Sequence, residues 1–120
     1  MRYYFHSGFI ALHVLHHAAE RPIYGHWMLL ELARHGYRVS CGTLYPTLHG
    51  LEREGLLKAR EGRAGERRRK FYTITAAGRR QLDRARRGVV ELAREVLTAS
   101  QRKQVAARRS GRPKRKEISA

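Results

Sequence analysis

Cysteine is nearly absent from this 120-residue chain, in which Cys41 stands alone. A single thiol excludes an intramolecular disulfide framework and a zinc finger with cysteine ligands, and it indicates a reducing compartment. No run approaches the roughly 18 apolar residues that a membrane span requires. Histidines interrupt the apolar stretch near the N-terminus, so we expect no secretory signal there. These absences predict a cytoplasmic protein, with room for one domain.

Acidic residues are also scarce: 10 stand scattered against 26 lysines and arginines. The chain has no G-x-S-x-G elbow, no phosphate-binding loop and no nucleophile at a telling distance from a histidine. We therefore predict that it is not an enzyme. The formal net charge of +16 instead favours a polyanion as the partner, with nucleic acid first.

The positive charge is unevenly distributed along the chain. Residues 1–57 hold 5 basic and 4 acidic groups, residues 58–88 hold 12 and 3, and residues 89–120 hold 9 and 3. The middle segment contains the densest block, residues 67–70. Within the last segment, the stretch from Arg102 to Lys116 has eight basic groups and no acid. It has too few apolar side chains to offset the entropy lost on ordering, so we predict a disordered basic tail over residues 100–120.

Three helices are predicted in the N-terminal half. Apolar spacing marks residues 5–19 and 24–35, the latter with a core stripe of Leu29, Leu32 and Ala33. A short turn follows, and Ser40 can cap a third helix by accepting a backbone N–H; Gly55 ends this helix. The buried face of this helix carries Leu44, Leu48 and Leu51. The opposite face carries Gly42, Pro46, His49 and Arg53, flanked by Thr43 and Tyr45.

A β-hairpin and a long helix are expected after the third helix. An extended run from Leu56-Leu57 to Arg63, a turn around residues 62–66 and an alternating return over residues 69–75 form the hairpin signature. In the helix over residues 76–99, Leu82, Val89 and Val96 recur every seven residues, and Leu92 lies on the same face. A monomer would expose this stripe, so these four residues predict a dimer interface.

The fold class is therefore mainly α with a small β-hairpin. The predicted parts are a winged helix-turn-helix domain over residues 1–75, a dimerisation helix over residues 76–99 and the basic tail over residues 100–120. A winged helix lays its third helix in the major groove of double-stranded DNA, where base edges are distinguishable. Arginines of the hairpin suit phosphates. The alternative is an architectural protein that binds nucleic acid without specificity through its tail.

Three sequence blocks resemble the PadR family of bacterial transcriptional regulators: Tyr24-Gly25, GTLYPTLHGLEREGLL (residues 42–57) and RRKFYTITAAGRRQL (residues 68–82). The resemblance, which covers about residues 5–98, implies a homodimeric winged-helix repressor of promoter DNA, released by an effector, acting at the nucleoid. One helix after the hairpin is typical of the shorter subgroup. Cys41 and the basic tail depart from the family pattern.

The DNA-facing positions that the resemblance implies are Ser40, Gly42, Thr43, Tyr45, Pro46, His49 and, in the wing, Arg67, Arg68, Arg69 and Lys70. For Tyr45 the alternative is packing against the hairpin.

Histidine is abundant, with seven in the chain and four in the first predicted helix. His13 and His17 are four residues apart and could chelate a divalent metal ion, as in H-x-x-x-H helices. A further ligand is needed, from His35 or from Glu91 or Glu95 of a partner subunit; His6 is too far from His13 to share an ion. The alternative is that these histidines form ordinary hydrogen bonds against the last helix.

A small apolar molecule is a competing effector. The first helix, with Phe9, and the last helix could enclose a pocket at the dimer interface in which Trp27 stacks on a flat ligand, although a core position is the commoner one for a tryptophan. Cys41 begins the third helix, where backbone N–H groups lower the pKa of a thiol. It could sense oxidants or simply be tolerated as a small residue.

Overall fold

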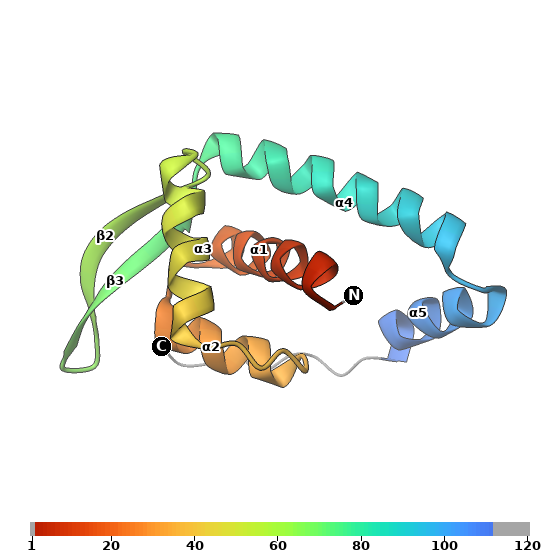
Figure 1. Cartoon of the computed structure of the whole chain (residues 1–120), viewed down its shortest axis with the longest axis horizontal. Helices are drawn as coiled ribbons and strands as arrows, with labels where there is room; N and C mark the ends of the chain where they lie inside the picture. The colour runs from red at the N-terminus through yellow and green to blue at the C-terminus, as the bar shows by residue number, and fades with distance from the viewer. Residues whose placement is uncertain (1, 112–120) are drawn as a thin grey trace. The chain divides into compact units, whose positions relative to one another are not determined.

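The computed structural model describes residues 2–111, and within them the side chains of residues 7–107. The elements in chain order are α1 (Arg2–Glu20), β1 (Ile23–Tyr24), α2 (Gly25–Arg34), α3 (Cys41–Arg53), β2 (Leu57–Ala64), β3 (Arg67–Ile74), α4 (Ala76–Val96) and α5 (Ala99–Gly111). Helices and one small sheet make up the structure, which confirms the predicted fold class (Figure 1). The chain forms two compact units, residues 1–83 and 84–120, and the boundary falls within α4.

The core of the first unit is built where apolar side chains recur at helical spacing. In α3, Leu44 and Leu48 are fully buried and Leu51 nearly so, as the spacing predicted. α1 contributes Ile10 and Val14 to the same core. Because burying one such side chain is worth about 1.5–3 kcal/mol, the leucines fix which face of α3 points outward.

The predicted core stripe of α2 is only partly right. Leu32 is buried, but Leu29 is half-buried and Ala33 is exposed, while Trp27 and Met28 occupy the inward positions. The physical reason lies just before the helix. Ile23–Tyr24 pairs with β3 as a strand too short to be recognised in the sequence, and this pairing sets where α2 starts and which side it buries.

The sheet has three antiparallel strands in the order β1-β3-β2. β2 and β3 pair from Leu57↔Ile74 to Ala64↔Arg67, so the returning strand begins two residues earlier than predicted. Gly65 and Glu66 form the turn, with φ of 64° at Gly65 and a negative φ at Glu66. This sign pattern fits a type II′ turn, which takes glycine at its first central position. The hairpin projects away from the helices of its unit (Figure 1).

One threonine joins the hairpin to α4. The Thr75 hydroxyl donates to the Gly55 carbonyl at 2.6 Å and accepts from the Gly78 N–H at 3.0 Å, which caps α4. Gly78 lies so close to the Leu56 carbonyl that a Cβ there would collide with it. Leu82, one turn further on, is 2 % exposed. Its assignment to an exposed dimer stripe is therefore wrong, because it belongs to the core of the first unit.

The second unit contains a helix where disorder was predicted. Thr98 and Gln101 form a capping box: the Thr98 N–H donates to Gln101 Oε1 at 3.1 Å and the Gln101 N–H donates to Thr98 Oγ1 at 3.2 Å. Arg102 donates to the Leu97 carbonyl at 2.7 Å. These local bonds start α5, so the prediction of a disordered tail does not describe residues 100–111. Its remainder, residues 112–120, lies outside the described residues. Among the described helices, none is long and apolar enough to cross a membrane.

Candidate nucleic-acid interface

The outward face of α3 is the first part of the candidate interface. With the three leucines turned inward, Gly42, Thr43, Pro46 and His49 are exposed, as predicted from their place opposite the buried face. Pro46 has no N–H to donate to the Gly42 carbonyl, so this first turn keeps an acceptor free of its usual helical bond. The face therefore offers small and polar groups of low charge, the type of surface that can approach base edges closely.

Ser40 occupies the N-cap of α3 with extended backbone, as predicted, but its side chain does not cap the helix. The carbonyl of Ser40 accepts from the N–H groups of Thr43 and Leu44, while its hydroxyl lies 3.4 Å from Thr43 Oγ1. The predicted side-chain capping bond is therefore wrong. Because Ser40 and Thr43 are both exposed, their hydroxyls lie together at the N-terminal end of the outward face.

Tyr45 links α3 to the start of α2. Its ring is half-buried and lies over Gly25, where an added Cβ would come 2.5 Å from Tyr45 Cε1. The Tyr45 ring also lies 6.4 Å from the His49 ring. Tyr24-Gly25 and the Gly42–Pro46 segment, two separate parts of the sequence pattern, thus meet in one contact.

The hairpin supplies the second part of the candidate interface, its cationic wing. Arg67 and Arg68 are exposed, and Arg68 pairs with Glu61 at 3.0 Å with both side chains 73 % exposed. Such an exposed pair contributes little and is easily exchanged for a phosphate. Register places Arg63 directly opposite Arg68. Like charges that face each other across a ladder are destabilising, so an anion between them would relieve the strand pair.

Arg63 is a candidate site residue that the sequence pattern missed. The dense block at residues 67–70 drew attention to β3, while the basic residues of β2, Arg63 among them, are spaced apart. Only the pairing register brings it to the block. The sequence could still have revealed Arg63, because a two-residue turn at Gly65-Glu66 places Arg63 opposite Arg68.

The other two predicted wing residues are held against the body of the first unit. The Arg69 guanidinium is half-buried and lies 5.0 Å from the centre of the Tyr24 ring. Lys70 Nζ lies 3.6 Å from Glu52 Oε1 and 5.6 Å above the Tyr72 ring. Burial raises the pKa of the Tyr72 phenol, so the ring below the ammonium group is neutral. These contacts orient the wing beside α3 and leave Arg67 and Arg68 more available than Arg69 and Lys70.

The predicted dimer residues beyond Leu82 lie in the second unit. Val89, Leu92 and Val96 are 48 %, 55 % and 62 % exposed, and the neighbouring Val90 is 51 % exposed. α4 thus carries an apolar stripe on a helix otherwise dense in arginine. A soluble chain rarely leaves such a stripe uncovered.

Trp27 does not take the part predicted for it in the effector pocket. Trp27 is 7 % exposed and its ring packs edge-to-face on His17 at 5.4 Å, so neither face is open for a flat ligand. The core alternative for Trp27 is the correct one. Phe9 is 44 % exposed. Cys41 is exposed at the first position of α3, and nothing in its surroundings assigns it a role.

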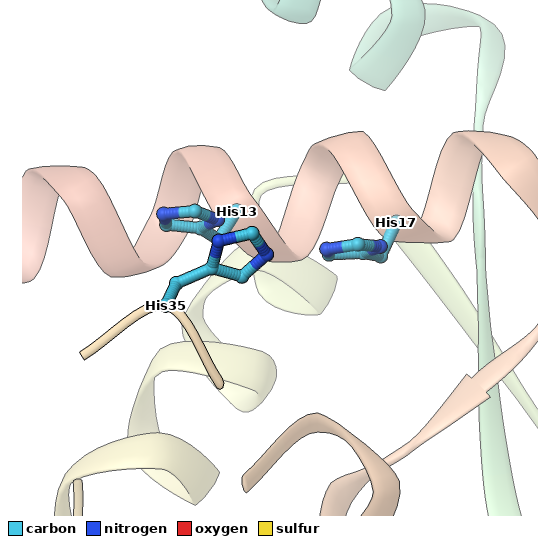
Figure 2. Close-up of side chains that lie close together, drawn as sticks. All are labelled: His13, His17 and His35. Carbon is cyan, nitrogen blue, oxygen red and sulfur yellow. The ribbon is translucent and has the colours of Figure 1, made fainter. Parts of the chain in front are cut away.

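The histidines selected for metal binding do come together. His13 and His17 on α1 lie beside His35, and the ligand nitrogens of the three rings are all within 4.8 Å of one another (Figure 2). Glu31, a buried carboxylate that the sequence pattern missed, lies next to them. Its position four residues before His35 was the available signal.

Comparisons with known proteins give the family. A model of the PadR-like transcriptional regulators matches residues 14–84. The chain is 53% identical over 93 residues to the transcriptional regulator Rv3488 of Mycobacterium tuberculosis (strain ATCC 25618 / H37Rv), covering 78% of this chain and 87% of that protein.

Solved structures agree with this assignment. The crystal structure of a PadR family transcriptional regulator from Eggerthella lenta DSM 2243 is similar with a TM-score of 0.70 and 32% identity, over 80% of this chain and 85% of that one. A PadR family transcription regulator from hypervirulent Clostridium difficile R20291 shares the fold, with a TM-score of 0.64 and 20% identity over 75% and 99% of the two chains. The chain therefore belongs to the PadR-like family of transcriptional regulators, which bind DNA and are not enzymes.

Proposed function

We propose that the chain is a homodimeric, sequence-specific repressor that an effector releases from promoter DNA. One observation carries the specific part of this proposal: the exposed face of α3 has little charge, whereas the wing beside it is rich in arginine. A face of this kind can discriminate bases, and a wing of this kind can hold phosphates. A dimer bound across a promoter, at the nucleoid in the cytoplasm, would deny access to RNA polymerase.

A comparison of two duplexes tests the specificity. Genome-wide pull-down identifies a bound promoter segment, and fluorescence anisotropy then compares this duplex with a scrambled one of equal composition. We expect the promoter segment to bind tighter by about a thousandfold or more at moderate salt. Equal affinity for both duplexes would contradict a sequence-specific repressor.

The exposed stripe on α4 supports the dimer. Symmetry lets the same apolar patch serve both subunits, and the residues that would form it are Val89, Leu92 and Val96. We expect sedimentation velocity to give a dimer mass for the full chain and a monomer mass for Leu92→Glu. Leu30→Glu is the matched control, because Leu30 in α2 is 57 % exposed and Leu92 is 55 % exposed. A wild-type protein that sediments as a 13.9 kDa monomer at micromolar concentration would contradict the dimer.

The architectural alternative predicts a different dependence on the basic C-terminal segment. Removal of residues 101–120 would abolish DNA binding by an architectural protein that depends on this segment. For the proposed repressor we expect a modest loss, concentrated at low salt, because the segment would add only phosphate contacts. Retention of preference for the promoter duplex after the removal supports the repressor.

A further inference from the structure

Three histidine rings from two helices face one another within the first unit. His13 and His17 lie one turn apart on α1, and His35 is the C-cap residue of α2 (Figure 2). The centroids of the His13 and His35 rings are 5.0 Å apart, and those of His13 and His17 are 6.4 Å apart. The fold thus adds a third imidazole to the pair on α1.

The spacing of these nitrogens is close to that of a coordination sphere. Zinc binds imidazole nitrogen at about 2.0–2.1 Å, so two ligands of one tetrahedral ion lie about 3.3–3.4 Å apart. The three ligand nitrogens lie within 4.8 Å of one another. Closing the remaining gap takes a movement of about 1 Å, within reach of side-chain rotation at the two less buried rings, His13 and His35.

Glu31 places a carboxylate beside two of the three histidines, His17 and His35. It is fully buried, and its Oε2 lies 3.3 Å from His17 Nε2 and 3.1 Å from His35 Nε2. These two distances already match the edges of a tetrahedron around a zinc-sized ion. Arg34 Nη1 pairs with the other oxygen, Oε1, at 2.9 Å. The arginine therefore holds the carboxylate in place while Oε2 faces the histidines.

His17 also has an outer partner. Its Nδ1 lies 3.7 Å from Glu20 Oε1, on the side of the ring opposite Nε2. A metal-bound histidine commonly donates its second ring N–H to a carboxylate, which fixes the tautomer. His16, His17 and Glu20 form a second cluster of donor atoms, but Glu20 is half exposed and adjacent histidines leave the helix in different directions. We therefore assign Glu20 to the support of His17.

His13 is crowded by other histidines. Burial lowers the pKa of His13, and the neighbouring His35 and His16 lower it further. Tyr37, which follows α2 in the turn before α3, meets the His13 ring edge-on at 5.1 Å.

We propose that His13, His17 and His35, with the Glu31 carboxylate as fourth donor, form a binding site for a divalent transition metal ion. Imidazole and carboxylate donors suit Zn²⁺, Co²⁺ and Ni²⁺ rather than Ca²⁺ or Mg²⁺, which prefer a shell of oxygens. The site joins α1 to the last residue of α2. In the free protein, Glu31 Oε2 contacts the imidazoles of both His17 and His35. A bound ion would instead be the shared partner of the three imidazoles and the carboxylate.

The position of the site also points to regulation, an extension that rests on the proposed repressor. Residues 36–40 are all that separate His35 from α3. An ion that draws His35 towards α1 acts on the turn that leads into the outward face of α3. The ion is therefore the effector of the proposed repressor, and its binding lowers the affinity for promoter DNA. Coupling between two such sites is typically about 5–150-fold in affinity.

Metal binding is tested first, without DNA. Metal-stripped full-length protein is titrated with ZnCl₂ by calorimetry and with CoCl₂ by visible absorption, which reports tetrahedral Co²⁺. We expect one ion per chain and intense tetrahedral bands. His35→Ala is the main variant because His35 is the least buried of the three histidines, and His26→Ala, at the exposed opposite end of α2, is the matched control. We expect a loss of at least tenfold in affinity for His35→Ala and none for His26→Ala.

The role of Glu20 and the effect of the ion on DNA binding are tested next. If Glu20 orients His17, Glu20→Gln lowers the affinity for Zn²⁺ by about 10–100-fold. Circular dichroism confirms that each variant is folded. Equal, negligible heats for the wild type and His35→Ala would overturn the metal site. Zinc binding that leaves promoter affinity unchanged would overturn the regulatory role alone, and failure of the metal-free protein to prefer promoter DNA would overturn only the proposed repressor.

Discussion

α3 and the hairpin beside it contribute to the same candidate interface, but they are held in place in different ways. Three buried leucines fix α3, so its outward face is set by the core. The outer half of the hairpin extends past the core, and backbone pairing with a few side-chain contacts holds it. The helix presents almost no charge and the hairpin presents mainly arginine. The core thus fixes the position of α3, the element that would contact base edges. The positive charge is greatest on the hairpin, where an exact position matters less.

This difference separates two properties of DNA binding, sequence preference and overall affinity, which a single measured affinity would combine. Contacts to base edges set the preference between sequences, whereas contacts to phosphates set overall affinity and its dependence on salt. Variants in α3 and in the wing should therefore differ in kind and not only in size.

The largest effect is expected at the junction on which both regions depend. Gly78→Ala would push a Cβ into the Leu56 carbonyl, which cannot move without shifting the hairpin. We expect a loss of about 1–3 kcal/mol in the free energy of unfolding. Gly88→Ala is the control in the same helix, because a Cβ there meets nothing within 4 Å. It should stabilise the protein by about 0.5–1 kcal/mol. Urea denaturation of both variants measures this contrast, and equal stability would refute the close approach.

The next effect concerns sequence preference. His49→Ala removes an exposed side chain from the outward face of α3 without touching the core. We expect promoter binding to weaken by about 1–3 kcal/mol, with little change for a scrambled duplex and an unchanged salt slope. Anisotropy titrations at several salt concentrations test this. An equal loss on both duplexes would mean that His49 contacts phosphate rather than a base.

The wing should show the opposite behaviour. Arg68→Ala is expected to weaken binding to promoter and scrambled duplexes alike and to reduce the slope of log K against log salt by about 1. Arg69→Ala provides the comparison, because Arg69 lies against Tyr24 and we expect it to alter stability more than the salt slope. The prediction fails if Arg68→Ala changes only the preference for the promoter.

The smallest effect involves the acid within the wing. Glu61→Gln removes the partner of Arg68 from an exposed pair, so we expect stability to change by no more than about 1 kcal/mol. DNA affinity should rise slightly at low salt, because Arg68 no longer has to leave a carboxylate. Anisotropy at two salt concentrations detects this rise. Weaker binding would show that Glu61 positions Arg68 for DNA.

The parts of the fold that repeat locally could be predicted from the sequence. Leu44, Leu48 and Leu51 define the buried face of α3 by their spacing alone, and the alternation in residues 69–75 defines a strand. What failed depended on contacts across the chain or on short signals. β1 has two residues, too few for a pattern, and its pairing reorients α2.

The errors near the C-terminus and at the histidines have similar causes. Thr98 and Gln101 form a four-residue capping box, but the composition of the segment obscured it and disorder was predicted. Leu82 shares its heptad position with Val89, yet only the approach of α4 to the hairpin base shows that Leu82 is buried. The pair His13 and His17 was visible in the sequence. The choice of His35 among the alternative ligands, and the burial of Glu31, required the packing of α1 on α2.

The facing arginines Arg63 and Arg68 also make the hairpin tip responsive to its surroundings. In the free protein Arg68 pairs with Glu61 and Arg63 donates to the Glu66 carbonyl, so each arginine has a local partner. The tip extends past the core, and its amide hydrogens should exchange with solvent faster than those near Leu57 and Ile74. A phosphate bound between the two arginines would slow this exchange, so protection of the tip amides would report DNA occupancy residue by residue.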